Sequence, residues 1–276
     1  MPEADASDRE ISLVTESGRT GAFTLRVGGT DQSHVDLKDP TRLEFDYIQR
    51  MADVLEARCV EGAPIRVVHI GGAGMTLARY ITATRPRSAQ VVLEPHEALT
   101  AFVRQHLPLP ARSGIKVRPV DGRAGIAAIR EDFADVVVLD AFDGARIPAE
   151  LTTGEFLSDV ARVLVNGGVL LANVTDHAPF PYVRNVVAGV SERFGHLAAS
   201  AEPATLKGRR FGNVLLAASD TLLQVEAIRR QAARSPFPYR VLDDGDVRKQ
   251  LAGGSAYTAD NSSMSPEPPG GKAFFA

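Results

Sequence analysis

The segment from Ile65 to Glu94 most constrains what this chain can fold into. An apolar run, IRVVHI, ends at Gly71-Gly72-Ala73-Gly74, a helix-like stretch follows, and the chain returns through VVLE. Glycines after a first strand let the backbone approach a ligand closely, and an acid that ends the second strand can bind both hydroxyls of a ribose. The spacing from Gly71 to Glu94 is close to the roughly 20 residues of such units. The segment therefore predicts a nucleoside-binding βαβ unit.

The glycine pattern favours an adenosyl ligand over a dinucleotide. NAD enzymes and S-adenosylmethionine enzymes both place an acid on a ribose after the second strand. The dinucleotide fingerprint also needs a third glycine for close packing of helix on strand, and Met75, Thr76 and Leu77 stand in the candidate positions. A pyrophosphate site is therefore disfavoured. A glycine-rich turn that binds nothing stays open as an alternative at this point.

Beyond this unit, strand-like and helix-like segments alternate. We expect strands at 65–70, 90–93, 115–118, 134–140 and 168–174, and helices at 75–84, 96–106, 124–130, 153–164 and 181–194. Two strand-like segments, 196–200 and 211–219, then follow each other without a helix between them, which predicts an antiparallel hairpin at the sheet edge, before a helix near 221–234. The order predicts a doubly wound, Rossmann-like α/β sheet of the S-adenosylmethionine methyltransferase type.

The sequence divides into three parts. Residues 1–40 contain the strand-like segments ISLVTE, AFTLRV and QSHVDL joined by glycine turns, which predicts a small N-terminal β-ribbon domain. Residues 41–252 are expected to form the Rossmann-like catalytic domain, which begins with a connecting helix from Leu43 to Val60. Residues 253–276 are rich in Gly, Ser and Pro, and we expect them to form a flexible tail.

The composition is that of an ordinary cytoplasmic enzyme. A chain of 276 residues with 44% hydrophobic residues can bury a sizeable core, and a formal net charge of -3 gives no electrostatic reason to bind nucleic acid. The single Cys59 excludes an internal disulfide and a multi-cysteine zinc site. The acidic N-terminal segment is unlike a signal peptide, and no apolar run is long enough for a membrane span. We expect a cytoplasmic protein without a metal, a nucleic-acid partner or a membrane partner.

Polar side chains follow the predicted strands at the edge where open α/β sheets bind ligands. Asp121-Gly122 follows the third strand, where a carboxylate can accept from an adenine amino group and the glycine leaves room for the ring. A helix-capping role for this Asp is the alternative. Asp140 and Asp143 follow the apolar strand VVVL. One of these acids can deprotonate an amine nucleophile while the other orients it, or both can act only as capping residues.

From the ribbon through the last strands, the chain resembles the spermidine synthase (polyamine aminopropyltransferase) family in the order of its motifs. The glycine segment 71–74 is similar to that family's GGGDG, Glu94 to its ribose acid, Asp121-Gly122 to its adenine-side DG, and Asp140 with Asp143 to its DxxDP. Members move an aminopropyl group from decarboxylated S-adenosylmethionine to an amine and release methylthioadenosine. The resemblance implies that Asp140 is the base, that Asp143 binds the acceptor amine, that Glu94 binds the ribose and Asp121 the adenine, and that Gln32 contacts the donor. It also suggests a homodimer or homotetramer.

The chain departs from the family on the acceptor side. Gly74 replaces the acid of GGGDG, and Tyr47-Ile48-Gln49 replaces a Tyr-His-Glu on the connecting helix. A dicationic polyamine needs carboxylates at both ends, so the acceptor is not fixed as putrescine. Candidate acceptor contacts are Tyr47, Asp143, His177 and Tyr182. The missing acid at position 74 would also make room for the carboxylate of intact S-adenosylmethionine, because like charges repel.

Three functions follow from these residues. The first is an aminopropyltransferase that uses decarboxylated S-adenosylmethionine and a small-molecule amine acceptor. The second is a methyltransferase, or another enzyme that uses S-adenosylmethionine itself. The third is a nucleoside-binding protein without catalysis. The two retained acids, Asp140 and Asp143, favour amine chemistry because simple binding would not require two desolvated carboxylates.

Overall fold

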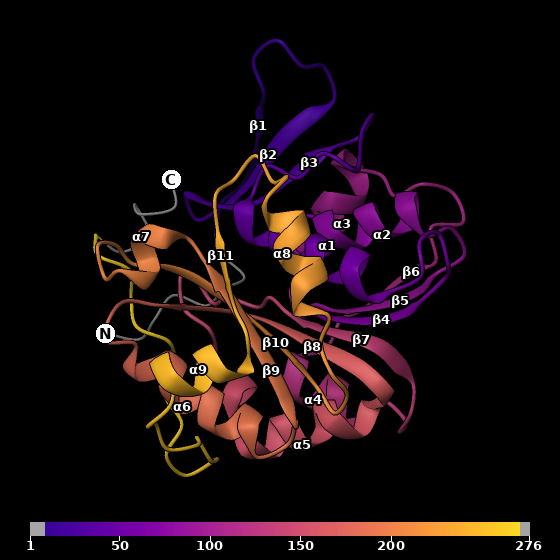
Figure 1. Ribbon diagram of the computed structural model, residues 1–276. Helices are drawn as coiled ribbons and strands as arrows, with labels where there is room; N and C mark the ends of the chain where they lie inside the picture. The colour runs from indigo at the N-terminus through magenta and orange to yellow at the C-terminus, as the bar shows by residue number, and fades with distance from the viewer. Residues whose placement is uncertain (1–8, 271–276) are drawn as a thin grey trace.

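The structure, a computed structural model, describes residues 9–270 and has an eight-stranded mixed sheet at its centre (Figure 1). The strand order is β11-β9-β10-β8-β7-β4-β5-β6. The strands are β4 (Arg66–Ile70), β5 (Ala89–Leu93), β6 (Ile115–Arg118), β7 (Ala134–Leu139), β8 (Leu164–Asp176), β9 (His196–Ala201), β10 (Gly212–Ser219) and β11 (Arg240–Leu242). Strands β4 to β8 run parallel, whereas β10, β9 and β11 are each antiparallel to their neighbours.

Helices cover both faces of this sheet, as Figure 1 shows. Successive strand residues point to opposite faces, so Val67 packs under α1 (Asp46–Arg58), α2 (Thr76–Thr84) and α8 (Val225–Ala232), whereas Val68 lies in the other core. That second core is covered by α4 (Gly122–Ala127), α5 (Gly154–Val163), α6 (Pro181–Ser191) and α9 (Asp244–Gln250), with a 3-10 turn, η2 (Ala149–Thr152), before α5. The predicted doubly wound, Rossmann-like fold is confirmed.

The N-terminal ribbon is a separate three-stranded antiparallel sheet, as expected. Its strands are β1 (Ile11–Thr15), β2 (Ala22–Val27) and β3 (Thr30–Asp36), in the order β1-β2-β3. Leu25 and Val35 of this ribbon share a small core with Met75 and with Val103 of α3 (Glu97–His106). Because this core joins the ribbon to α2 and α3, β3 lies against the glycine segment that follows β4.

The last strands differ in detail from the sequence expectation. The antiparallel pair β9 and β10 forms, but a four-residue helix, α7 (Pro203–Leu206), lies between them, and β11 rather than the hairpin forms the sheet edge. Strand β11 has three residues, too few for a periodic pattern to be read. Helix α9 was also missed, because DGDVRKQ buries only Val247 and carries no apolar stripe.

Residues 253–270 contain no helix or strand, yet they are anchored to the domain rather than loose. Ser265 is fully buried, and its hydroxyl accepts from the backbone N–H of Ile147 at 2.8 Å. The carbonyl of Tyr257 accepts from the N–H of Gly154, also at 2.8 Å. Backbone bonds and one buried aromatic ring anchor this part, which composition alone does not reveal. Residues 271–276 of the expected tail lie outside the described residues, and the domain boundaries at 40 and 252 stay predictions.

Within residues 9–270, none of the helices has the length and apolar character that crossing a membrane requires.

Candidate functional site

A cavity of about 390 Å³ opens at the carboxyl ends of β4 and β7. The chain moves outward from β4 through β5 to β6 and then returns to β7 on the other side of β4. Such a reversal leaves a crevice between the two strands, which is where open α/β sheets bind ligands. The sequence-predicted residues that line the cavity are Gln32, Tyr47, Gly71, Gly72 and Asp140.

Gly71 brings the loop after β4 into direct contact with the loop after β7. Its backbone φ is +93°, and a Cβ at this position would lie 2.2 Å from the carbonyl oxygen of Asp140. The backbone N–H of Asp140 in turn donates to the carbonyl of Ile70 at 2.9 Å. The glycine is required because the protein's own backbone occupies the space of a side chain. Gly71 thereby helps to position Asp140.

Glu94 holds the glycine loop in place. Its Oε2 accepts from the backbone N–H groups of Gly72 at 2.9 Å and Ala73 at 3.3 Å, while its Oε1 accepts from the N–H of His96 at 3.0 Å. The side chain is buried and is not part of the cavity wall. The carboxylate therefore shapes the loop, and contact between Glu94 and a ribose stays a prediction.

We expect Glu94→Gln to weaken the binding of adenosyl nucleosides by about tenfold, because the glutamine turns an amide NH₂ toward backbone donors that need acceptors. Titration calorimetry with methylthioadenosine measures this loss, and a lower melting temperature should accompany it. Glu97→Gln is the matched control, since Glu97 is an exposed acid in the first turn of α3. Equal affinity in both variants and the unmodified protein would contradict a role for Glu94 in forming the loop.

Asp140 is the carboxylate best suited to accept a proton. Its side chain is partly exposed in the cavity that it lines, and its Oδ1 accepts from the Nδ2 of Asn173 at 3.0 Å. Burial raises the pKa of the Asp140 carboxyl to about 6, and the hydrogen bond from Asn173 opposes this rise. A base whose pKa lies near neutrality combines a large ionised fraction with useful basicity.

Asn173 donates a hydrogen bond to Asp140. It is buried on β8, near the end of the strand expected over 168–174, and the sequence analysis gave it no role. An ionised carboxylate only accepts hydrogen bonds, so the amide nitrogen of Asn173 must face Asp140 and its Oδ1 must point elsewhere. Within the described part of the chain this buried oxygen has no hydrogen-bond partner. The carboxylate of Asp140 is the acceptor that faces the cavity, and Asn173 supports it from β8.

Tyr47 lines the same part of the cavity from α1. Burial, together with the negative charges of Asp140 and Asp46, raises the pKa of its phenol well above the usual value. The phenol therefore stays neutral and keeps its O–H as a donor. Of the three residues 47–49 in the altered family motif, Tyr47 and Ile48 line the cavity, whereas Gln49 donates instead to the carboxylate of Asp53.

The other acids of the predicted site lie off the cavity wall. Asp143 is half exposed and forms an ion pair of 2.6 Å with Arg9. Asp121 caps α4 by accepting from the N–H of Ala124 at 2.8 Å. A Cβ on Gly122 would lie 2.4 Å from the side chain of Ile70, so core packing occupies the space that the sequence assigned to an adenine ring. The ligand contacts expected of Asp121, Gly122 and Asp143 stay predictions.

His177 and Tyr182 also lie away from the cavity wall. Strand β8 continues to Asp176, whose carboxylate accepts from the N–H groups of His177 and Val183 and thereby turns the chain into α6. Tyr182 is buried in the core with its hydroxyl 3.2 Å from that of Thr152, and His177 is exposed. The structure therefore offers no support for acceptor contacts by these two side chains.

Gly74 does not leave an open space where the family has an acid. Its N–H donates to the hydroxyl of Ser33 at 3.0 Å, and a Cβ on Gly74 would lie 2.8 Å from the Cβ of Ser33. Strand β3 thus fills the position. The expected room for the carboxylate of intact S-adenosylmethionine is absent.

Sequence reasoning missed several charged residues on the cavity wall. They come from β3, the approach to α1, and the connection between β9 and β10: Asp31, Glu44, Asp46, Glu202 and Arg210. Asp46 is adjacent to Tyr47 and could have been found from that motif. Glu202 and Arg210 had no local signal, because only the pairing of β10 with β8 brings this connection to the cavity. Among residues 9–270, no three His, Cys, Asp or Glu side chains gather as metal ligands would.

The fold and the site define a class of protein. A glycine loop at the switch point of a mixed sheet, held by a buried acid and facing a carboxylate of raised pKa, is the arrangement of a Rossmann-like transferase. Human methyltransferase-like protein 13, solved in complex with SAH, shares this fold with a TM-score of 0.52 at 19% identity, over 69% of this chain and 91% of that chain.

Two closer relatives identify the family. A probable spermidine synthase from Corynebacterium glutamicum is 31% identical, with a TM-score of 0.85 over 92% of this chain and 95% of that chain. A curated polyamine aminopropyltransferase from Chromobacterium violaceum is 28% identical over 238 residues, which are 84% of this chain and 83% of the relative. No family model matches the sequence. The chain belongs to the spermidine synthase (polyamine aminopropyltransferase) family, and it is a transferase.

Proposed function

We propose that this protein transfers an aminopropyl group from decarboxylated S-adenosylmethionine to the nitrogen of a small amine and releases methylthioadenosine. Membership of the family supports the reaction class. The observation that carries the proposal is Asp140, a cavity carboxylate whose pKa is raised to about 6 by burial.

The proposed chemistry needs one base and no metal. The lone pair of the neutral acceptor nitrogen attacks the carbon next to the sulfonium, so a C–N bond forms while the C–S bond breaks and its electron pair returns to sulfur. Asp140 takes the proton that the acceptor nitrogen loses. The amide of Asn173 donates to Asp140 Oδ1 and thereby helps to hold the carboxylate in place. The neutral Tyr47 phenol is a further polar contact.

The donor half of the proposed site consists of Gln32, Gly71 and Gly72 on the cavity wall, with Glu94 behind the loop. Asp121 and Gly122 remain candidates for the adenine end. Ser33 fills the space beside Gly74, which removes one reason to favour intact S-adenosylmethionine as the donor. A homodimer or homotetramer stays a prediction of the family resemblance.

Thermal denaturation with candidate ligands tests this function. A ligand that binds only the folded state raises the melting temperature, by an amount set by its concentration and Kd. We expect methylthioadenosine and decarboxylated S-adenosylmethionine to stabilise the protein, and NAD to have no effect. Release of methylthioadenosine on addition of an amine then measures turnover.

The same experiment discriminates the alternatives. Stabilisation by S-adenosylmethionine and S-adenosylhomocysteine, with no shift from the decarboxylated donor, would indicate a methyltransferase. Absence of a shift with all of the adenosyl compounds would contradict the proposed function. Binding without turnover on any amine would leave a nucleoside-binding protein.

A further inference from the structure

Most carboxylates of the cavity are in contact with an arginine of the protein itself. Five line the cavity: Asp31, Glu44, Asp46, Asp140 and Glu202. Four of the five each form an ion pair with an arginine, and Asp140 is the one of the five that has no ion-pair partner among residues 9–270. The cavity therefore offers an amine one carboxylate that is not already in an ion pair.

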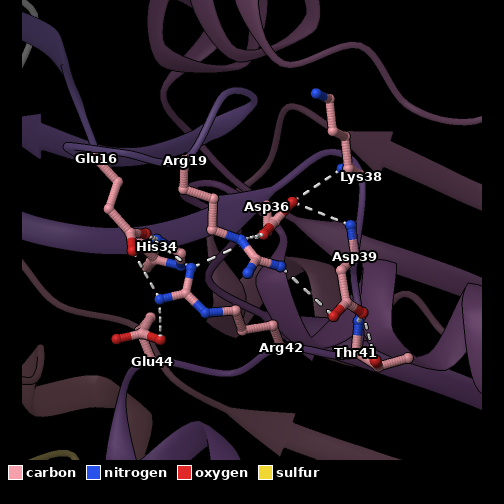
Figure 2. A network of polar contacts seen from close by, with 9 residues as sticks. All are labelled: Glu16, Arg19, His34, Asp36, Lys38, Asp39, Thr41, Arg42 and Glu44. Carbon is pink, nitrogen blue, oxygen red and sulfur yellow. Dashed lines mark hydrogen bonds and ion pairs between the residues drawn. The ribbon is translucent and has the colours of Figure 1, made fainter.

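Three of these pairs use arginines that lie outside the cavity wall. Arg26 holds Asp31 at 2.5 Å, and Arg42 binds Glu44. Figure 2 shows Arg42 between Glu16 and Glu44, where it also donates to both oxygens of Glu16 at 2.7 and 2.9 Å. These contacts fix the guanidinium of Arg42 beside Glu44.

The pair of Asp46 with Arg50 is the most deeply anchored. The Arg50 side chain is 1% exposed and lies 3.0 Å from Asp46. It also donates to the carbonyls of Ser200 and Asn213 at 2.7 and 3.2 Å. Burial lowers the pKa of Arg50, and the negative charges of Asp46 and Glu202 oppose this change. Glu202 is therefore an electrostatic neighbour of the Asp46 end of the cavity.

Arg210 differs from the other three arginines because it lines the cavity itself. Its guanidinium is 3.1 Å from Glu202, and its side chain is 49% exposed. It precedes β10, where Asn213 pairs with Thr175, two residues beyond Asn173 on β8. Thr175 lies about 7 Å beyond Asn173 along β8. Arg210 lies three residues before Asn213 and so further still from Asn173, and Arg210 and Glu202 line the end of the cavity away from Asp140.

We propose that Arg210 is a specificity residue that occupies the place of an acceptor's second ammonium, so that the acceptor is an amine with a single positive charge rather than an α,ω-diamine. This inference rests on the proposed function. Asp140 and Glu202 line one cavity, so a diamine held at Asp140 and extended toward Glu202 meets the guanidinium of Arg210, which already forms the ion pair there and repels a second cation. A neutral or hydroxylated far end meets no such repulsion.

The test compares two acceptors of equal length, putrescine and butylamine, with decarboxylated S-adenosylmethionine as donor and methylthioadenosine release as the readout. For the unmodified protein we expect a higher kcat/KM with butylamine. Arg210→Gln frees Glu202, and we expect it to raise kcat/KM for putrescine by about tenfold or more while changing that for butylamine little. Arg210→Lys keeps the cation and should behave as the unmodified protein does.

Arg248→Gln is the matched control. Arg248 is 54% exposed and pairs with Asp244 on α9, away from the cavity wall. This variant should leave the ratio of the two kcat/KM values unchanged. Glu202→Gln should not raise kcat/KM for putrescine, because the positive charge of Arg210 then remains without a carboxylate beside it. The proposal is overturned if the unmodified protein prefers putrescine, or if Arg210→Gln leaves the ratio unchanged.

Binding measurements keep this inference separate from the proposed function. If neither amine yields methylthioadenosine although the adenosyl ligand binds, the transfer reaction fails as a proposal. Calorimetry with putrescine in the presence of saturating methylthioadenosine then still tests whether Arg210 excludes a diamine. About tenfold tighter binding of putrescine to Arg210→Gln supports the specificity role, and unchanged binding overturns it.

Discussion

Asp140→Asn is expected to lower kcat by about a hundredfold to ten-thousandfold, the range that a positioned general base contributes. Asparagine has nearly the shape of aspartate, so binding of methylthioadenosine should be largely kept. Single-turnover assays and calorimetry separate the two effects. Equal loss of turnover and of ligand binding would contradict the assignment of Asp140 as the base. Asp143→Asn is an informative comparison, because the ion pair of Asp143 with Arg9 predicts the smaller loss.

The pH dependence should follow the same carboxyl. Because the base must be ionised, kcat/KM of the unmodified protein is expected to fall as the pH drops below about 6. The folded-state pKa of Asp140 lies above its unfolded value, so the stability from this group is complete below the unfolded pKa and is lost as the pH rises through about 6. Asp140→Asn should therefore lose less stability than the unmodified protein over that pH range.

Gly71→Ala is expected to lower the free energy of unfolding by about 3 kcal/mol or more, because it combines backbone strain with a steric clash. The added Cβ would lie 2.2 Å from the carbonyl oxygen of Asp140, and neither backbone segment can move without breaking the hydrogen bond between Asp140 and Ile70. Chemical denaturation measures the loss. Turnover should fall as well, because the carboxylate of Asp140 would be displaced.

Gly18→Ala separates the effect of backbone strain from the effect of a steric clash. Gly18 has a φ of +77°, close to that of Gly71, but no atom lies within 4 Å of the position of a Cβ. Gly18→Ala should lower the free energy of unfolding by about 1 kcal/mol, the penalty for the left-handed backbone alone. Equal losses of unfolding free energy in Gly71→Ala and Gly18→Ala would show that the steric contact with Asp140 adds nothing to the destabilisation.

Most of the fold was readable from local patterns. Alternating apolar runs and helical stripes predicted the strands β4 to β8 and the helices between them, because each element buries a face that its own periodicity marks. The segment from Ile65 to Glu94 likewise predicted a glycine loop followed by an acid. The short β11 and the polar α9 were missed, since three residues and a single buried Val247 carry no periodic signal.

The charge balance of the site was decided by the tertiary structure. Sequence placed Asp140 at a strand end, but burial raises the pKa of its carboxyl, and the hydrogen bond that opposes this rise comes from Asn173, 33 positions away along the chain. Gly71 was read as a place for a ligand, whereas its missing side chain is needed for the Asp140 carbonyl. Glu202 and Arg210 reach the cavity only because β10 pairs with β8. Local periodicity reports which face of an element is buried, but ion pairs and steric contacts depend on residues that only the folded chain brings together.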